Sequence, residues 1–259
     1  REKIIAYNAG KALAPASALK ILPTAAMLDT AGGNFRFSTL LLTEGTIDKQ
    51  SRTLKGNLII RGGGDPALAS SRYDSVYQAP GLFLETWAQK LKTKGVDTIS
   101  GKLILDATIY GEQSVPDTWN YQDIGNYYGA GAHGLSYNEN QYKIVFRAPQ
   151  KPGQLTTVRY TKPEIPGLEI VNYVKSSEVQ ADNAYIFGIP ESNRIVIRGT
   201  IPAGRSAFSI KGAIPRPEVL LQQEFIKILE KQDIVLKNGA KVVKQPYATE
   251  EADTLAVQH

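Results

Sequence analysis

Hydrophobic residues recur at helical spacing in three segments of the chain. The first predicted helix runs from about residue 15 to 31, where Gly32-Gly33 ends it. The second covers 81–94 and the third covers 217–231. Both of these repeat apolar residues every three or four positions, which is typical of a helix with one buried face. Pro23 lies inside the first helix and is expected to bend it just past its first turn.

Most of the remaining chain alternates polar and apolar residues over short runs, which predicts strands separated by turns. Strands are expected at 4–7, 35–41 and 54–61, and a turn or loop is expected to begin at Glu44-Gly45. Residues 96–105 predict a strand, a turn at Ser100-Gly101 and a second strand.

Two of the helical segments are followed by the same succession of elements. Residues 84–105 (LETWAQKLKTKGVDTISGKLIL) and 221–243 (LQQEFIKILEKQDIVLKNGAKVV) both read as helix, strand, turn and strand. This repeat predicts that the two segments pack in one domain, with residues 149–205 inserted between them. The inserted stretch is rich in Pro, Val and Tyr and contains short alternating runs, which predicts a small all-β unit.

Composition excludes several classes of protein. The chain has 259 residues, a formal net charge of +5, 42% hydrophobic residues and 21% charged residues, as in folded globular proteins. No run of about 18 apolar residues occurs, so no membrane-spanning helix is expected. The positive charge is spread along the chain, which argues against a nucleic-acid partner.

The scarcity of thiol and imidazole groups limits the possible chemistry. The chain has no cysteine, which excludes a disulfide scaffold, a thiol nucleophile and a Cys-ligated metal. His133 and His259 are the only histidines, which argues against a histidine-based triad and a multi-histidine zinc site. No metal or cofactor is expected, and acid–base chemistry falls to Lys, Asp, Glu or Tyr.

One segment combines a nucleophile with a base. Ser17-Ala18-Leu19-Lys20 is the one Ser-x-x-Lys in the chain, and it lies where the first predicted helix begins. Lys20 is three residues on and reaches the same face as Ser17. A desolvated lysine can take the proton of a serine hydroxyl that attacks a carbonyl. From the spacing alone, the alternative is that Ser17 is a helix N-cap and Lys20 a solvated side chain.

The residues around this segment match a known family. Residues 13–21, followed by Thr24-Ala25-Ala26, resemble the nucleophile segment of the penicillin-recognising serine enzymes. Further matching segments are 35–39, 54–68, 99–103 with Asp106, and 128–130 with Leu135 and 138–140. Together these segments resemble the class C low-molecular-mass penicillin-binding proteins, the D-Ala-D-Ala carboxypeptidase/endopeptidase family, over nearly the whole chain.

The resemblance implies an α+β multidomain fold. In this family a transpeptidase-like domain is interrupted, shortly after its Ser-x-x-Lys helix, by β-rich inserted accessory domains. The first part of the transpeptidase-like domain is expected at 1–43, and the chain returns toward it at 244–259. Accessory domain II is expected at 44–148 and 206–243, and accessory domain III at 149–205.

The resemblance also implies a hydrolase of peptidoglycan. Members cleave the terminal D-alanine, or the cross-link, of peptidoglycan stem peptides through an acyl-serine intermediate, and β-lactams acylate the same serine. By resemblance, Ser17 is the nucleophile and Lys20 its base, in a periplasmic or other extracytoplasmic protein without cofactor. The alternatives are a non-catalytic cell-wall binding or scaffolding module and a β-lactamase, which the long insertion disfavours. The pattern predicts no particular oligomeric state.

Two elements of the family's active site differ here. No Lys-Thr-Gly or Lys-Ser-Gly occurs in the chain. Ser136 and Asn138 have the residue types and spacing of Ser-x-Asn, but the residues around them resemble a segment of the family's second domain and not of its catalytic domain. The family's catalytic Ser-x-Asn comes soon after the stretch resembling 254–259. We therefore expect this chain to be a fragment that is inactive on its own.

Asp123 is the candidate substrate-binding residue. In the family, an acidic residue shortly after a tryptophan pairs with the free amino group of a diaminopimelate side chain, and Asp123 follows Trp119 at a longer spacing. The alternative is a loop aspartate that satisfies nearby backbone N–H groups. Asp65 and residues 138–140 are expected to form a turn and a structural network rather than ligand sites.

Overall fold

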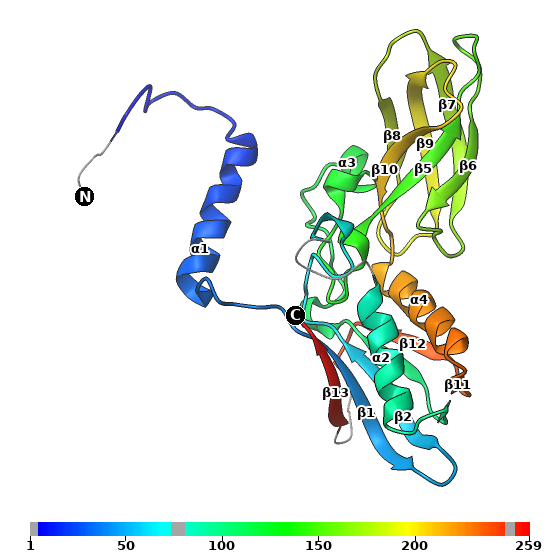
Figure 1. Ribbon diagram of the computed structural model, residues 1–259. Helices are drawn as coiled ribbons and strands as arrows, with labels where there is room; N and C mark the ends of the chain where they lie inside the picture. Colours follow the sequence, from blue (N-terminus) through cyan, green and yellow to red (C-terminus); the bar gives the residue numbers. More distant parts are fainter. Residues whose placement is uncertain (1–4, 74–80, 247–251) are drawn as a thin grey trace. The chain divides into compact units, whose positions relative to one another are not determined.

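The structure is a computed structural model that describes residues 5–73, 81–246 and 252–259. The chain divides into two compact units, one up to Arg36 and one from Phe37 to His259. Helices and several sheets are mixed along the chain, and this confirms the expected α+β multidomain class (Figure 1).

The first unit is built around one helical segment. A 3₁₀ helix, η1 (Ala16–Lys20), continues directly into α1 (Ile21–Ala31). Pro23 is therefore the third residue of the α-helix, where its missing N–H has no intrahelical partner to lose. Gly32 ends the helix as predicted, with φ of 76° and an N–H that donates to Leu28 O at 3.0 Å.

The predicted strand at 4–7 is wrong for the residues that can be described. Ile4 lies outside the described residues, and residues 5–7 form no strand. They have no second strand to complete their backbone hydrogen bonds, and a lone strand is not stable. The turn that follows is present, because the Lys11 N–H donates to Asn8 O at 2.9 Å.

A mixed sheet forms the base of the second unit (Figure 1). Its strands are β1 (Thr39–Asp48), β2 (Thr53–Arg61), β3 (Thr98–Ile99), β4 (Leu103–Asp106), β11 (Val235–Leu236), β12 (Ala240–Val243) and β13 (Ala252–Gln258). β1 pairs antiparallel with β13 on one side and with β2 on the other. β2 then pairs in parallel with both β3 and β4. β3 pairs in parallel with β11, and β4 pairs in parallel with β12.

The turn expected at Glu44-Gly45 is wrong, because β1 continues through both residues to Asp48. Gly45 stands directly opposite Gly56 of β2. A Cβ atom on either glycine would run into the backbone of the other strand. Here the glycine marks a close approach of two backbones inside a sheet and not the end of a strand.

The predicted repeat is confirmed. Helix α2 (Leu82–Thr93) leads into β3 and β4, and helix α4 (Pro217–Lys231) leads into β11 and β12. The second strand pair lies beside the first, in parallel. The two helices pack together through Trp87 and Phe225, whose ring centroids lie 6.3 Å apart in an edge-to-face arrangement. Both side chains belong to the main hydrophobic core.

Two three-stranded sheets form the β-rich part of the second unit (Figure 1). Sheet B has the order β10-β5-β6 and sheet C the order β7-β9-β8. The strands are β5 (Gln141–Arg147), β6 (Thr157–Lys162), β7 (Glu169–Ser177), β8 (Asn183–Phe187), β9 (Arg194–Pro202) and β10 (Phe208–Ala213). β5 and β10 flank the predicted insert at 149–205 and pair with each other. The division of the chain into domains remains a prediction.

Candidate active site

Ser17 and Lys20 lie in the same turn of η1. A 3₁₀ helix has about three residues per turn, so side chains three apart stand above one another on one side. Pro15 occupies the N-cap position, and no side chain caps this helix. Ser17 is therefore not an N-cap, whereas Lys20 is exposed, as the alternative reading expects. Both side chains are exposed, so a substrate carbonyl could reach the hydroxyl.

The helical segment that carries Ser17 presents apolar side chains to solvent. Neither η1 nor α1 contains a buried residue. Leu19, Ile21 and Leu22 are exposed by 53%, 68% and 66%. Side chains of this kind are most often buried in folded proteins. Within the described residues of the first unit, no other side chain buries the apolar surface next to Ser17.

Asp123 lies in the short helix α3 (Tyr121–Ile124) and is half-buried. Asn120 caps this helix by accepting a hydrogen bond from the Gln122 N–H at 3.2 Å. Burial, followed by the charge and the hydrogen bond of the Asp123 carboxylate, raises the pKa of the Tyr128 hydroxyl. Asp123 thus interacts with a neighbouring aromatic side chain and remains partly exposed.

The surroundings of Asp123 are rich in exposed aromatic rings. Tyr127 and Tyr128 pack edge to face at 5.3 Å between centroids. Tyr121 packs against Phe187 of β8 at 5.9 Å. We call the exposed rings here the aromatic patch, which consists of Trp119, Tyr121, Tyr127, Tyr128 and Tyr185. Such rings provide flat apolar contact next to a carboxylate.

Ser136 and Asn138 lie in a network of turns, in which Ser136 is buried and Asn138 is partly exposed. The Ser136 side chain is buried and accepts a hydrogen bond from Asn140 Nδ2 at 3.2 Å. Asn138 Nδ2 donates to Gln141 O at 2.6 Å. Glu139 accepts a hydrogen bond from Ser70 Oγ at 2.6 Å. The structural network expected at 138–140 is confirmed, and the burial of Ser136 argues against a catalytic role.

The turn expected at Asp65 is also confirmed. Asp65 Oδ1 accepts a hydrogen bond from the Ala67 N–H at 2.8 Å, which is the Asx-turn arrangement. Burial raises the pKa of this carboxyl.

Sequence analysis missed a buried charge cluster in the second unit. His133 Nδ1 lies 3.4 Å from Glu218 Oε2, and Lys244 Nζ lies 2.5 Å from Glu218 Oε1. The Glu218 side chain is only 1% exposed. Burial acts to raise the pKa of Glu218, but His133 and Lys244 outweigh it and hold the pKa below its ordinary value. No local pattern joins three residues so far apart in the chain.

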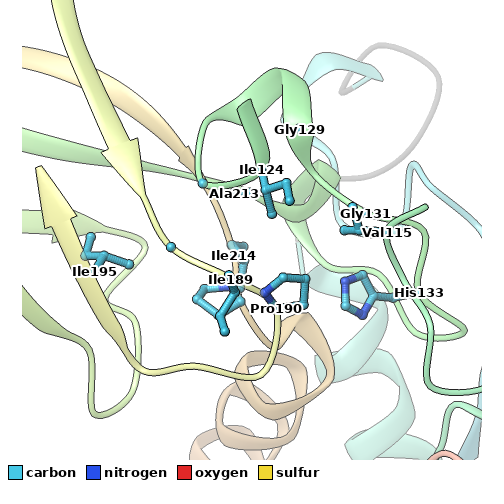
Figure 2. A pocket seen from close by; sticks show the side chains of 13 residues that line it. Val115, Ile124, Gly129, Gly131, His133, Ile189, Pro190, Ile195, Ala213 and Ile214 are labelled. Atoms are coloured by element: carbon cyan, nitrogen blue, oxygen red, sulfur yellow. The ribbon is translucent and has the colours of Figure 1, made fainter. Parts of the chain in front are cut away.

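His133 also lines a cavity of about 20 Å³, which has room for about one water molecule (Figure 2). Figure 2 shows its ring facing Pro190 and Ile189, and Ile124 lies at another side of the cavity. The walls are mostly apolar. Within the described ranges, no group of three or more His, Cys, Asp or Glu side chains could hold a metal ion. In the same ranges, no helix is long and apolar enough to cross a membrane.

Comparison with known proteins identifies a matching family and two similar relatives. The model of the D-Ala-D-Ala carboxypeptidase 3 (S13) family matches residues 1–259. The chain is 23% identical to a D-alanyl-D-alanine carboxypeptidase of Actinomadura sp. (strain R39), over 98% of this chain and 46% of the relative. It is 24% identical to D-alanyl-D-alanine carboxypeptidase DacB of Haemophilus influenzae, over 83% of this chain and 42% of the relative.

The fold is similar to that of a solved structure. The crystal structure of penicillin binding protein 4 (dacB) from Haemophilus influenzae superposes with a TM-score of 0.72 at 21% identity, covering 95% of this chain and 51% of that one. A second structure of that protein, in complex with a β-lactam, gives a TM-score of 0.63 at 22% identity. The chain thus spans about half the length of the relatives that it matches.

Proposed function

Because the chain belongs to the D-Ala-D-Ala carboxypeptidase 3 (S13) family, we propose that it supplies the nucleophile segment and the β-rich accessory part of a serine carboxypeptidase/endopeptidase that acts on peptidoglycan stem peptides. The observation that carries this proposal is the position of Ser17 and Lys20 in one turn of η1, directly before α1. The names of the relatives support the substrate class. An extracytoplasmic location follows from that substrate.

The proposed chemistry proceeds in two steps. Ser17 Oγ attacks the carbonyl carbon that precedes the terminal D-alanine while Lys20 Nζ takes the hydroxyl proton. The proton passes to the leaving amino group, D-alanine departs and an acyl-serine remains. Water then attacks the carbonyl carbon of this ester, the shortened peptide leaves with a free carboxyl group, and a proton of the water returns to Ser17 Oγ to restore the hydroxyl. A β-lactam would acylate Ser17 by the same first step, with its ring amide in place of the peptide bond.

Labelling with a fluorescent penicillin tests this proposal. In a polypeptide that carries this chain together with Ser-x-Asn and Lys-Thr-Gly elements, we expect stoichiometric labelling that mass mapping places on Ser17. We expect Ser17→Ala to abolish it and Ser38→Ala to leave it intact. The 259-residue chain by itself should not be labelled, because it has no Lys-Thr-Gly to hold the substrate.

The other outcomes of this experiment discriminate the alternatives. No labelling of the polypeptide with all three elements would overturn the catalytic proposal and favour a wall-binding or scaffolding module. Labelling followed by rapid hydrolysis of the acyl-enzyme would favour a β-lactamase. Labelling at a residue other than Ser17 would overturn the site assignment alone.

We further propose that Asp123 contacts the free amino group of a diaminopimelate side chain. We expect Asp123→Asn to lower kcat/KM for peptides with that free amine about fivefold, as the loss of about 1 kcal/mol of ion pairing implies. Peptides with an acetylated amine should be unaffected. Asp117→Asn removes an exposed carboxylate from the same segment and serves as the matched control. Equal loss on both kinds of peptide would eliminate the specificity role of Asp123.

A further inference from the structure

Three lysines form a row across sheet B. Lys143 of β5 stands directly opposite Lys211 of β10 on one side and Lys162 of β6 on the other. All three are exposed. Directly opposite residues on neighbouring strands project to the same face, with Cβ atoms about 5 Å apart. We call Lys143, Lys162 and Lys211 the lysine row.

The lysine row works against the stability of the sheet. Like charges directly opposite each other on neighbouring strands are destabilising. None of the strand residues of sheet B, all of which are described, is an Asp or Glu that could offset the charge. Among the described carboxylates, none forms an ion pair with a lysine of the row.

Protection of the sheet edges does not explain this arrangement. Lysines on edge strands often prevent a sheet from pairing with another chain. That reading fits Lys162 and Lys211, because β6 and β10 are the outer strands of sheet B. It fails for Lys143, which is in the central strand β5 and receives repulsion from both sides. The central lysine therefore needs another reason.

The same lysines line a cleft of about 190 Å³ between sheet B and the turns before it. The cleft is also lined by Ser71, Arg72, Asn138, Glu139, Gln141 and Tyr142. The one carboxylate among them, Glu139, is already bound by Ser70 Oγ and by Arg72, whose Nη2 lies 2.8 Å away. At the other end of the row, Lys211 Nζ lies 5.5 Å from the centroid of the Tyr127 ring. The cleft thus has an excess of positive charge and is lined by hydroxyl and amide groups.

We propose that the lysine row and its cleft bind a phosphate group. Ammonium groups bind phosphate as compact point charges on flexible side chains. A guanidinium fork binds carboxylate and phosphate alike, but the Arg72 guanidinium is already paired with Glu139, so the lysine row supplies the unpaired charge of the cleft. The hydroxyl of Ser71 and the amides of Asn138 and Gln141 add uncharged hydrogen-bonding groups. The site lies in the β-rich part and goes beyond the proposed hydrolase function.

Titration of the 259-residue chain with inorganic phosphate tests this proposal. Binding is followed by calorimetry with the ionic strength held constant by sodium chloride. The test variant is Lys143→Gln/Lys162→Gln/Lys211→Gln. The matched control is Lys49→Gln/Lys94→Gln/Lys237→Gln, which removes three exposed lysines outside the row. We expect at least tenfold weaker binding in the row variant and less than twofold change in the control.

Two further measurements keep the test decisive. The row variant should unfold at the same temperature as the wild type or higher, since repulsion is removed, so lost binding will not reflect misfolding. A vesicle of phosphatidylglycerol and phosphatidylcholine in a 3:7 ratio, bound by the wild type and not by the row variant, would identify a lipid headgroup as the source of the phosphate. Binding of inorganic phosphate without binding of the vesicles would identify a soluble phosphate compound.

Several outcomes would overturn the proposal. An equal loss of binding in both variants would show that only net charge matters. Acetate or citrate that binds as tightly as phosphate at the same ionic strength would show that the cleft does not select phosphate. No measurable binding of phosphate or vesicles by the wild type would remove the site altogether. None of these results bears on Ser17, whose acylation is measured separately.

Discussion

Replacing Lys20 with alanine is expected to slow the acylation of Ser17 about 10³-fold, within the range that a positioned general base contributes. The measurement uses a polypeptide that carries this chain with Ser-x-Asn and Lys-Thr-Gly elements, and follows the rate of penicillin labelling. Ser17 and Lys20 share one turn of η1, so no other basic side chain of that turn can replace the lysine. Without the base, the hydroxyl keeps its proton and remains a weak nucleophile.

A second substitution separates the loss of a base from the loss of a charge. Lys20→Arg keeps the positive charge but introduces a guanidinium, which does not release a proton under ordinary conditions. We expect Lys20→Arg to be nearly as slow as Lys20→Ala. Lys11→Ala removes an exposed lysine of the same unit and should leave the rate unchanged. Full activity of Lys20→Arg would show that Lys20 only supplies charge.

The helices were the most predictable part of the fold, because a helix is specified by residues that are close in sequence. The apolar spacing in 81–94 and 217–231 gave α2 and α4 to within a residue at each end. The similarity between the two helix–strand segments also predicted that they pack in one domain, and their strands do lie side by side in one sheet. Gly32 also ended α1 as expected, because it adopts a positive φ that other residues avoid.

The errors arose where a neighbour that is distant in sequence decides the local structure. Gly45 reads as a turn residue, yet it lies within β1 because Gly56 of β2 stands opposite. β5 and β10 belong to the β-rich part because they pair with each other across more than sixty intervening residues, which no local pattern reveals. Strand register is set by such pairing and by turn geometry and not by composition.

The candidate sites follow the same division. The Ser17–Lys20 pair is a local feature, and the resemblance to a family added the context that spacing alone could not supply. The lysine row could not be predicted, because Lys143, Lys162 and Lys211 are far apart in sequence and only strand register aligns them. The cluster of His133, Glu218 and Lys244 is equally non-local.

That cluster carries the largest expected effect on stability. We expect Lys244→Met to lower the free energy of unfolding of the 259-residue chain by about 3 kcal/mol, the lower end of the cost of breaking a buried ion pair. The Lys244 and Glu218 side chains are only 15% and 1% exposed, so water cannot replace the lost ammonium group. Lys237→Met, at an exposed position beyond β11, should change stability by less than about 0.5 kcal/mol. Urea unfolding followed by circular dichroism measures both.

A second substitution shows whether the loss comes from the uncompensated carboxylate. In Lys244→Met/Glu218→Gln the buried group is neutral, so we expect the double variant to regain at least about 1.5 kcal/mol relative to Lys244→Met. If the double variant is no more stable than Lys244→Met, the methionine itself disturbs the packing and the charge argument fails. A coupling free energy near zero between the Lys244 and Glu218 substitutions would likewise show that the two side chains contribute independently to stability.

The dependence on pH gives a further test of the same cause. In the wild type the pKa of Glu218 is held below its ordinary value of 4.5, so its stabilising contribution is complete above pH 4.5 and is lost as the pH falls through the lowered pKa. In Lys244→Met, burial is still opposed by His133 but no longer by the ammonium group, so the Glu218 pKa should be higher than in the wild type. The folded variant then takes up its proton at a higher pH than the folded wild type does, so the stability lost relative to the wild type grows as the pH rises through this interval. The stability deficit of Lys244→Met should therefore be small at pH 4 and large at pH 7, whereas a packing defect would give the same deficit at both.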